Sequence, residues 1–124
     1  MCKMAVITIN DKTIRVAEIK IPAIRNAVEK ISKLKFIDRA ILFGSALTND
    51  CTEDSDIDIA MFGSIYNSQY LKRKDVARFF HELLNGTEKS ESYDILYFRN
   101  DQIHTDSLIM NEIRTKGTEI YAVQ

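Results

Sequence analysis

Short apolar runs of strand length alternate with amphipathic helical patterns along this 124-residue chain. Apolar residues repeating at helical spacing predict three helices, over residues 22–35, 71–84 and 106–116. Apolar runs bounded by Gly, Ser or charged residues predict four strands, over residues 40–43, 57–62, 93–98 and 119–122. This alternation favours an α/β or α+β fold, in which helices pack on a mixed β-sheet.

The first 20 residues carry a different pattern. Residues 4–9 and 13–19 are rich in β-branched side chains and flank Asn10-Asp11-Lys12, which suits a hairpin turn. A chain of this length can bury one core without disulfides or a structural metal. We therefore expect a single domain over residues 1–124, with an N-terminal hairpin in residues 1–20 and a catalytic core in residues 21–124.

Composition and charge exclude several classes of protein. No apolar run approaches the roughly 18 residues that a membrane helix needs, and the N-terminus lacks the pattern of a signal peptide, so we expect a cytoplasmic protein. The net charge of -1 gives no basic field for duplex phosphates, which argues against nucleic acid as a partner. Cys2 and Cys51 fit neither a disulfide framework nor a zinc spacing and are expected to be free thiols.

Three aspartates lie at the starts of the predicted strands. Asp56 and Asp58 are two residues apart, so their side chains share one face of the strand over 57–62. Asp94 opens the run over 93–98 and supplies a third carboxylate if the two strands adjoin. A charge on a buried strand is costly unless it is paired or binds a cation, and no lysine or arginine adjoins these aspartates in sequence. Hard divalent cations prefer such oxygen ligands, so the pattern predicts a metal site.

Gly44-Ser45 ends the predicted strand over 40–43 at a turn. A glycine there lets backbone amides approach a phosphate closely, and the serine hydroxyl can add a hydrogen bond. Facing a carboxylate triad, such a turn indicates a nucleotide–metal site, since magnesium bridges carboxylates and phosphate oxygens in nucleotidyl transfer.

Gly44-Ser45, ten intervening residues, Asp56-Ile57-Asp58 and a later strand aspartate resemble the minimal nucleotidyltransferase domains of the polymerase-β-like superfamily. The resemblance covers about residues 22–122 and includes the closing helix, glycine and strand over 113–121. It implies a nucleotidyltransferase fold of the polymerase-β palm type. It also assigns Mg²⁺ binding and catalysis to Asp56, Asp58 and Asp94, and nucleotide binding to Gly44 and Ser45.

The chain departs from the family pattern just after the Gly-Ser turn. Relatives commonly carry Arg-Gly there, whereas this chain has Thr48-Asn49. Thr48 therefore replaces a phosphate-binding arginine. Asn49 is the milder change, because asparagine tolerates the left-handed backbone that glycine would adopt.

The resemblance implies an enzyme that transfers a nucleoside monophosphate to an acceptor hydroxyl, with ATP as the expected donor and AMP as the expected group. Small stand-alone relatives often act as antitoxins beside a helical HEPN-domain toxin, and some adenylylate that partner. The alternative is a catalytically weak or inactive antitoxin that acts by binding its partner, in line with the lost arginine. An antibiotic-modifying transferase would need a further acceptor-binding domain. The acceptor and the base of the nucleotide stay open.

Other motifs are excluded by their missing residues. The stretch beginning at Asp54 starts like a calcium loop but has Ile59 and Ile65 at the glycine and glutamate positions. Walker-type and dinucleotide-binding glycine motifs do not occur. His81 and His104 have no cysteine or histidine at ligand spacing, so neither is assigned a role.

Overall fold

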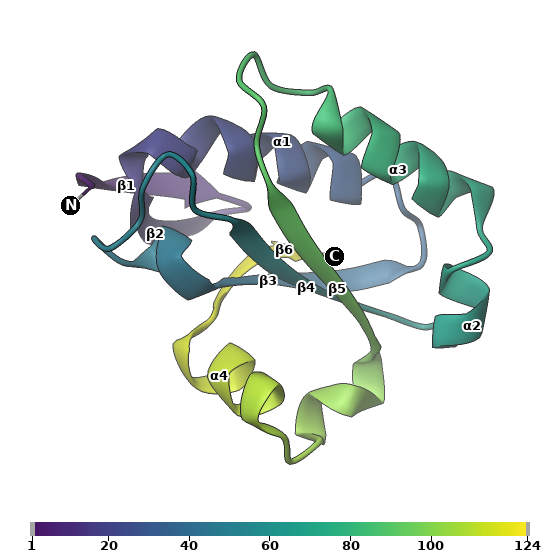
Figure 1. Ribbon diagram of the computed structural model, residues 1–124. Coiled ribbons are helices and arrows are strands. Elements are labelled where there is room, and N and C mark those ends of the chain that lie inside the picture. The colour runs from purple at the N-terminus through teal and green to yellow at the C-terminus, as the bar shows by residue number, and fades with distance from the viewer. Residues whose placement is uncertain (1, 124) are drawn as a thin grey trace.

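The computed structural model describes residues 2–123 and is built around a four-stranded sheet of order β5-β4-β3-β6 (Figure 1). Its strands are β3 (Ile37–Phe43), β4 (Ile57–Gly63), β5 (Tyr93–Arg99) and β6 (Thr118–Ala122). β4 and β5 are parallel, whereas β3 pairs antiparallel with both β4 and β6. The predicted mixed sheet with packed helices is therefore confirmed.

Helices cover both faces of this sheet. α1 (Ile21–Ile31) and α3 (Lys74–Leu84) lie on one face and α4 (Leu108–Lys116) on the other (Figure 1). The larger core fills the α1/α3 face, and a smaller core on the α4 face contains Ile41, Phe43, Ala60, Phe62, Met110 and Ile113. Among the helices of residues 2–123, none combines the length and apolarity that a bilayer crossing requires.

The remaining elements are short. They are the helix α2 (Asn67–Tyr70) and the 3₁₀ turns η1 (Glu18–Lys20), η2 (Gly44–Leu47) and η3 (Asn100–His104). The turn η2 directly follows β3, so the Gly-Ser pair lies in a tight turn at the end of a central strand. α4 begins after Ser107, whose hydroxyl accepts a hydrogen bond from the Met110 amide at 3.2 Å, as an N-cap does.

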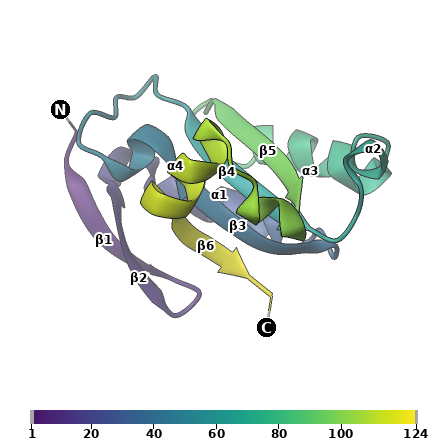
Figure 2. The ribbon, with the colours of Figure 1, turned by 90° about the horizontal axis from the view of Figure 1, so that it is seen from below.

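The predicted N-terminal hairpin is present as a separate antiparallel sheet of β1 (Met4–Ile9) and β2 (Lys12–Ala17). Asn10 and Asp11 form its turn with φ of 50° and 64°, the left-handed conformation that Asn and Asp tolerate best. The turn lies beside β6 (Figure 2), where Asn10 Nδ2 donates to the Ile120 carbonyl at 2.7 Å and Lys12 pairs with Glu119 at 2.8 Å.

The single helix predicted over 71–84 is wrong at its start, because residues 71–73 separate α2 from α3. Tyr70 is buried and stacks on Tyr97 with 4.3 Å between ring centroids, which holds α2 against β5. Arg73 is then extended, places its guanidinium 4.8 Å from the Phe36 ring centroid and binds both carboxylate oxygens of Asp75. These tertiary contacts override the local helical pattern.

Candidate metal and nucleotide site

The parallel pairing of β4 and β5 brings two of the predicted aspartates together. Asp58 on β4 is in register with Asp94 on β5, and side chains in register on parallel strands point to the same face. That face is the α4 face, because Ala60 and Phe62, two and four residues further along β4, belong to the core under α4. Asp58 is half-buried, Asp94 is exposed, and Asp56 is exposed just before β4.

The turn after β3 lies next to the Asp58 carboxylate. β3 runs antiparallel to β4 with Phe43 opposite Asp58, so the next residue, Gly44, lies against the Asp58 carboxylate. Gly44 has φ of +80°, and a Cβ added there would clash with Asp58 Oδ2. Both the backbone conformation and the close approach therefore require glycine. Ser45, the second predicted nucleotide contact, is half-buried in η2.

The electrostatics of Asp58 are those of a crowded anion. Burial, followed by the negative charges of Asp94, Asp56 and Glu112, raises the pKa of Asp58 from 3.8 to about 6. Within residues 2–123 its carboxylate takes part in no salt bridge and accepts no side-chain hydrogen bond. Among the described residues, the charges that shift the pKa of Asp58 are thus three carboxylates, with no lysine or arginine to offset them.

Glu112 is the member of this cluster that sequence reasoning missed. It lies on the exposed side of α4, two residues after the buried Met110. Its negative charge acts on Asp58 because α4 packs on the same face of the sheet. The sequence pattern of α4 shows an amphipathic helix but not which face of the sheet the helix covers, so no local signal could identify Glu112.

The donor set suits a hard divalent cation. In the part of the chain that the structure describes, no three Asp, Glu, His or Cys side chains converge closely enough to form a metal cluster by themselves. Magnesium does not need such a cage, since it commonly binds one or two carboxylates together with substrate phosphates and water. Asp58 with Asp94 or Asp56 supplies that number of carboxylates, and a cation would relieve the repulsion at Asp58.

The loop after η2 differs from the expected shape. Asn49 is not left-handed, since Asn10 and Asp11 are the non-glycine residues with positive φ between residues 2 and 123. The N-terminal segment holds this loop instead: the Cys2 amide donates to the Asn49 carbonyl at 3.0 Å. Asn49 therefore does not make use of the left-handed backbone that asparagine would tolerate there.

Thr48 faces back into the turn that it follows. Its amide and its hydroxyl both donate to the Ser45 carbonyl, at 2.9 and 3.1 Å. The hydroxyl also accepts from the Asp50 amide at 3.3 Å. The position of the common arginine is thus occupied by a short side chain that stabilises the loop.

The chain is similar in sequence to one known protein family. No curated protein matches the chain. The family described as Polymerase beta, Nucleotidyltransferase matches residues 25–124, which cover the whole four-stranded sheet together with Asp56, Asp58 and Asp94. The match spans far more than half of the chain and agrees with the mixed sheet and its helices. The chain belongs to the polymerase beta nucleotidyltransferase family.

Proposed function

We propose that this protein is a magnesium-dependent nucleotidyltransferase that moves AMP from ATP to an acceptor hydroxyl. The observation that supports this best is the contact between Gly44 and the Asp58 carboxylate, with Asp94 in register beside it. It brings a glycine turn suited to phosphate and two metal-binding carboxylates to one point of the sheet. The acceptor hydroxyl lies on a partner protein, and a HEPN-type toxin is the partner that we propose.

In this proposal, the aspartates bind the metal ion, and the turn after β3 binds the nucleotide. Asp58, Asp94 and Asp56 would hold Mg²⁺, which supplies charge stabilisation for the phosphates when bound. The Gly44 backbone and the Ser45 hydroxyl would bind the triphosphate. Asp58 has a pKa of about 6, so it is largely ionised at pH 7 even before the cation binds.

The first prediction is that Asp58→Asn removes magnesium-dependent ATP binding. Loss of a ligand should cost more than the roughly 100-fold that disturbing a supporting residue around a metal can cost. Calorimetry with ATP and MgCl₂ measures this, and far-UV circular dichroism checks that the variant folds. Asp50→Asn is the matched control, since Asp50 is exposed in the neighbouring loop and does not act on Asp58. Equal affinity of Asp58→Asn and wild type would rule out the site.

The second candidate function is an antitoxin that neutralises its partner by contact alone. The observation that favours it is Thr48, whose polar groups bond back to the Ser45 turn and bring no positive charge to the phosphates. Transfer of label from α-labelled ATP to a HEPN-type partner separates the two functions. Label on the partner with wild type and none with Asp58→Asn supports the enzyme. Tight partner binding without label supports the contact-only antitoxin.

A further inference from the structure

Lys20 is a fully buried lysine outside the candidate site. It ends η1, directly before α1, and is 1% exposed. Its Nζ donates to the Glu53 carbonyl at 2.9 Å and to Glu91 Oε2 at 3.0 Å. Lysine is almost never fully buried unless its charge is paired, so these two contacts account for its position.

The two partners of Lys20 lie in the segments that lead into the two acidic strands. Glu53 lies four residues before the first residue of β4, and Glu91 lies two residues before the first residue of β5. The same two segments also meet through the Ile57 amide, which donates to the Ser92 carbonyl at 2.9 Å. Lys20 thus links the segments that lead into β4 and β5 at the end where the aspartates lie.

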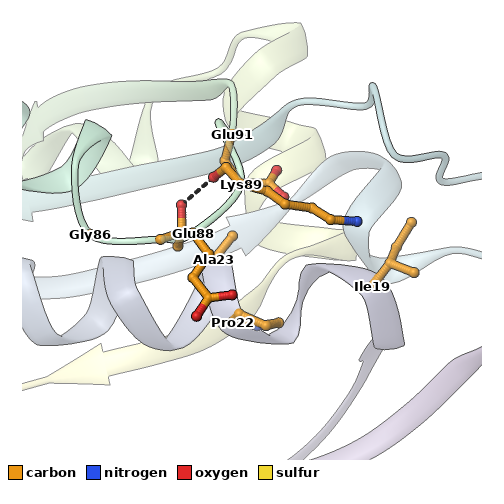
Figure 3. Close-up of a pocket in the computed structure, with 8 residues that line it drawn as sticks. Ile19, Pro22, Ala23, Gly86, Glu88, Lys89 and Glu91 are labelled. Atoms are coloured by element: carbon orange, nitrogen blue, oxygen red, sulfur yellow. Dashed lines mark hydrogen bonds between the residues drawn. The ribbon is translucent and has the colours of Figure 1, made fainter.

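The segment that carries Glu91 lies over the start of α1. Residues 86–91 arch over it and enclose a pocket of about 430 Å³ with Ile19, Pro22 and Ala23 (Figure 3). Within the segment, Thr87 Oγ1 donates a hydrogen bond to the Lys89 carbonyl at 2.6 Å, the dashed line of Figure 3. Gly86 packs against the Asn26 side chain of α1 at one end of the segment, and Lys20 holds the other end through Glu91.

We propose that Lys20 is a positioning residue: it holds the segments before β4 and β5, and with them Asp56, in place beside the Asp58–Asp94 pair that the strand pairing sets, and it thereby sets the affinity for magnesium and nucleotide. This inference rests on the proposed function. Lys20 acts through geometry, because the charges that act on Asp58 are those of Asp94, Asp56 and Glu112. A buried ammonium with two fixed acceptors holds both segments more firmly than an exposed pair could.

The chain supplies a matched control for this role. Lys89 pairs with Glu53 at 3.7 Å and so connects the same two segments, but both side chains are exposed, at 80% and 77%. Exposed pairs contribute little. Lys89→Met should therefore leave magnesium and ATP binding unchanged, although it removes one positive charge from the same region.

The test variant must remove Lys20 without leaving a buried unpaired charge. Lys20→Met alone leaves the Glu91 carboxylate without its charged partner. It is therefore compared with the double variant Lys20→Met with Glu91→Leu, because replacing both members of a buried pair by apolar residues often restores stability. Each full-length variant is measured by thermal unfolding and by calorimetry with MgCl₂ and ATP. Hydrogen exchange of the Ile57 amide reports the contact between the two segments directly.

The expected result is a double variant with wild-type Tm, faster exchange at Ile57 and ATP affinity lower by about 10-fold or more, as for residues that support metal ligands. Wild-type affinity in a double variant of restored Tm would make Lys20 merely structural and overturn the inference while the proposed function stands. If wild type itself does not bind ATP in the presence of magnesium, both the proposed function and this inference are wrong.

Discussion

Lys20 and Asp58 are two charged residues that the fold treats in opposite ways. The Lys20 ammonium is fully buried and lies within 3.0 Å of a carbonyl and a carboxylate. The Asp58 carboxylate is only half-buried, and its burial, followed by the negative charges of neighbouring carboxylates, raises its pKa to about 6. A charge that is satisfied inside the chain supports the structure, whereas a charge that repels its neighbours indicates a ligand from outside.

The largest expected effect is a loss of stability when Lys20 loses its charged partner. Glu91→Gln leaves the buried Lys20 without its counter-charge and should lower the free energy of unfolding by about 3 kcal/mol. Urea unfolding at pH 7 measures the change. Glu53→Gln is the control, because the Glu53 side chain is exposed and Lys20 contacts only its carbonyl. Equal, small effects of both variants would mean that Lys20 does not depend on its charged partner.

In the absence of metal, Asp58→Asn should raise the free energy of unfolding, whereas Glu91→Gln lowers it. The native pKa of Asp58 lies above 3.8, so the folded state binds this proton more tightly than the unfolded chain does. Ionising Asp58 therefore costs stability as the pH rises from about 4 through 6. At pH 7 the asparagine removes that cost and should add about 1 kcal/mol, a value reduced for solvent screening of the exposed part.

Urea unfolding in EDTA at several pH values measures this second effect. The advantage of Asp58→Asn over wild type should shrink as the pH falls from 7 toward 4, because wild-type Asp58 becomes protonated over that range. Asp50→Asn should show no such pH dependence. A variant that is less stable than wild type at pH 7 would contradict the description of Asp58 as a crowded anion.

The smallest expected effect concerns nucleotide transfer. Under the proposed function, Thr48→Arg adds a cation to the loop after the Gly44-Ser45 turn and should raise label transfer from α-labelled ATP by roughly threefold, a part of what one preorganised donor can contribute. Thr48→Ala separates this gain from the loss of the hydrogen bond to Ser45. If Thr48→Arg transfers no more label than Thr48→Ala, the missing arginine does not limit this protein.

The parts of the molecule that local patterns determine could be predicted from the sequence. Short apolar runs located the sheet strands, β-branched runs around a turn located the hairpin, and period-3.6 repetition located three helices, although β3 begins at Ile37, before the predicted start at residue 40. The aspartates could be identified because charges are costly on otherwise apolar strands. Gly44 could be identified as a turn residue, but its contact with Asp58 depends on the antiparallel pairing of β3 and β4.

The rest depends on contacts between distant segments. Local sequence alone predicts an exposed lysine at position 20. Its burial depends on Glu53 and Glu91, which lie 33 and 71 residues away in sequence. Glu112 joins the acidic cluster only because α4 packs on the Asp58 face. Among residues 2–123, the left-handed residues other than glycine lie in the hairpin turn and not at Asn49, whose carbonyl accepts a hydrogen bond from the Cys2 amide.

The hairpin turn beside β6 has a consequence for how copies of this protein meet in solution. β6 is an edge strand, and an edge strand offers unpaired backbone groups on which another chain can add a strand and aggregate. Here Asn10 Nδ2 occupies the Ile120 carbonyl, and Lys12 brings a charge to Glu119. The β1-β2 hairpin thus hinders intermolecular β-pairing at this edge of the sheet. It lies outside the candidate site.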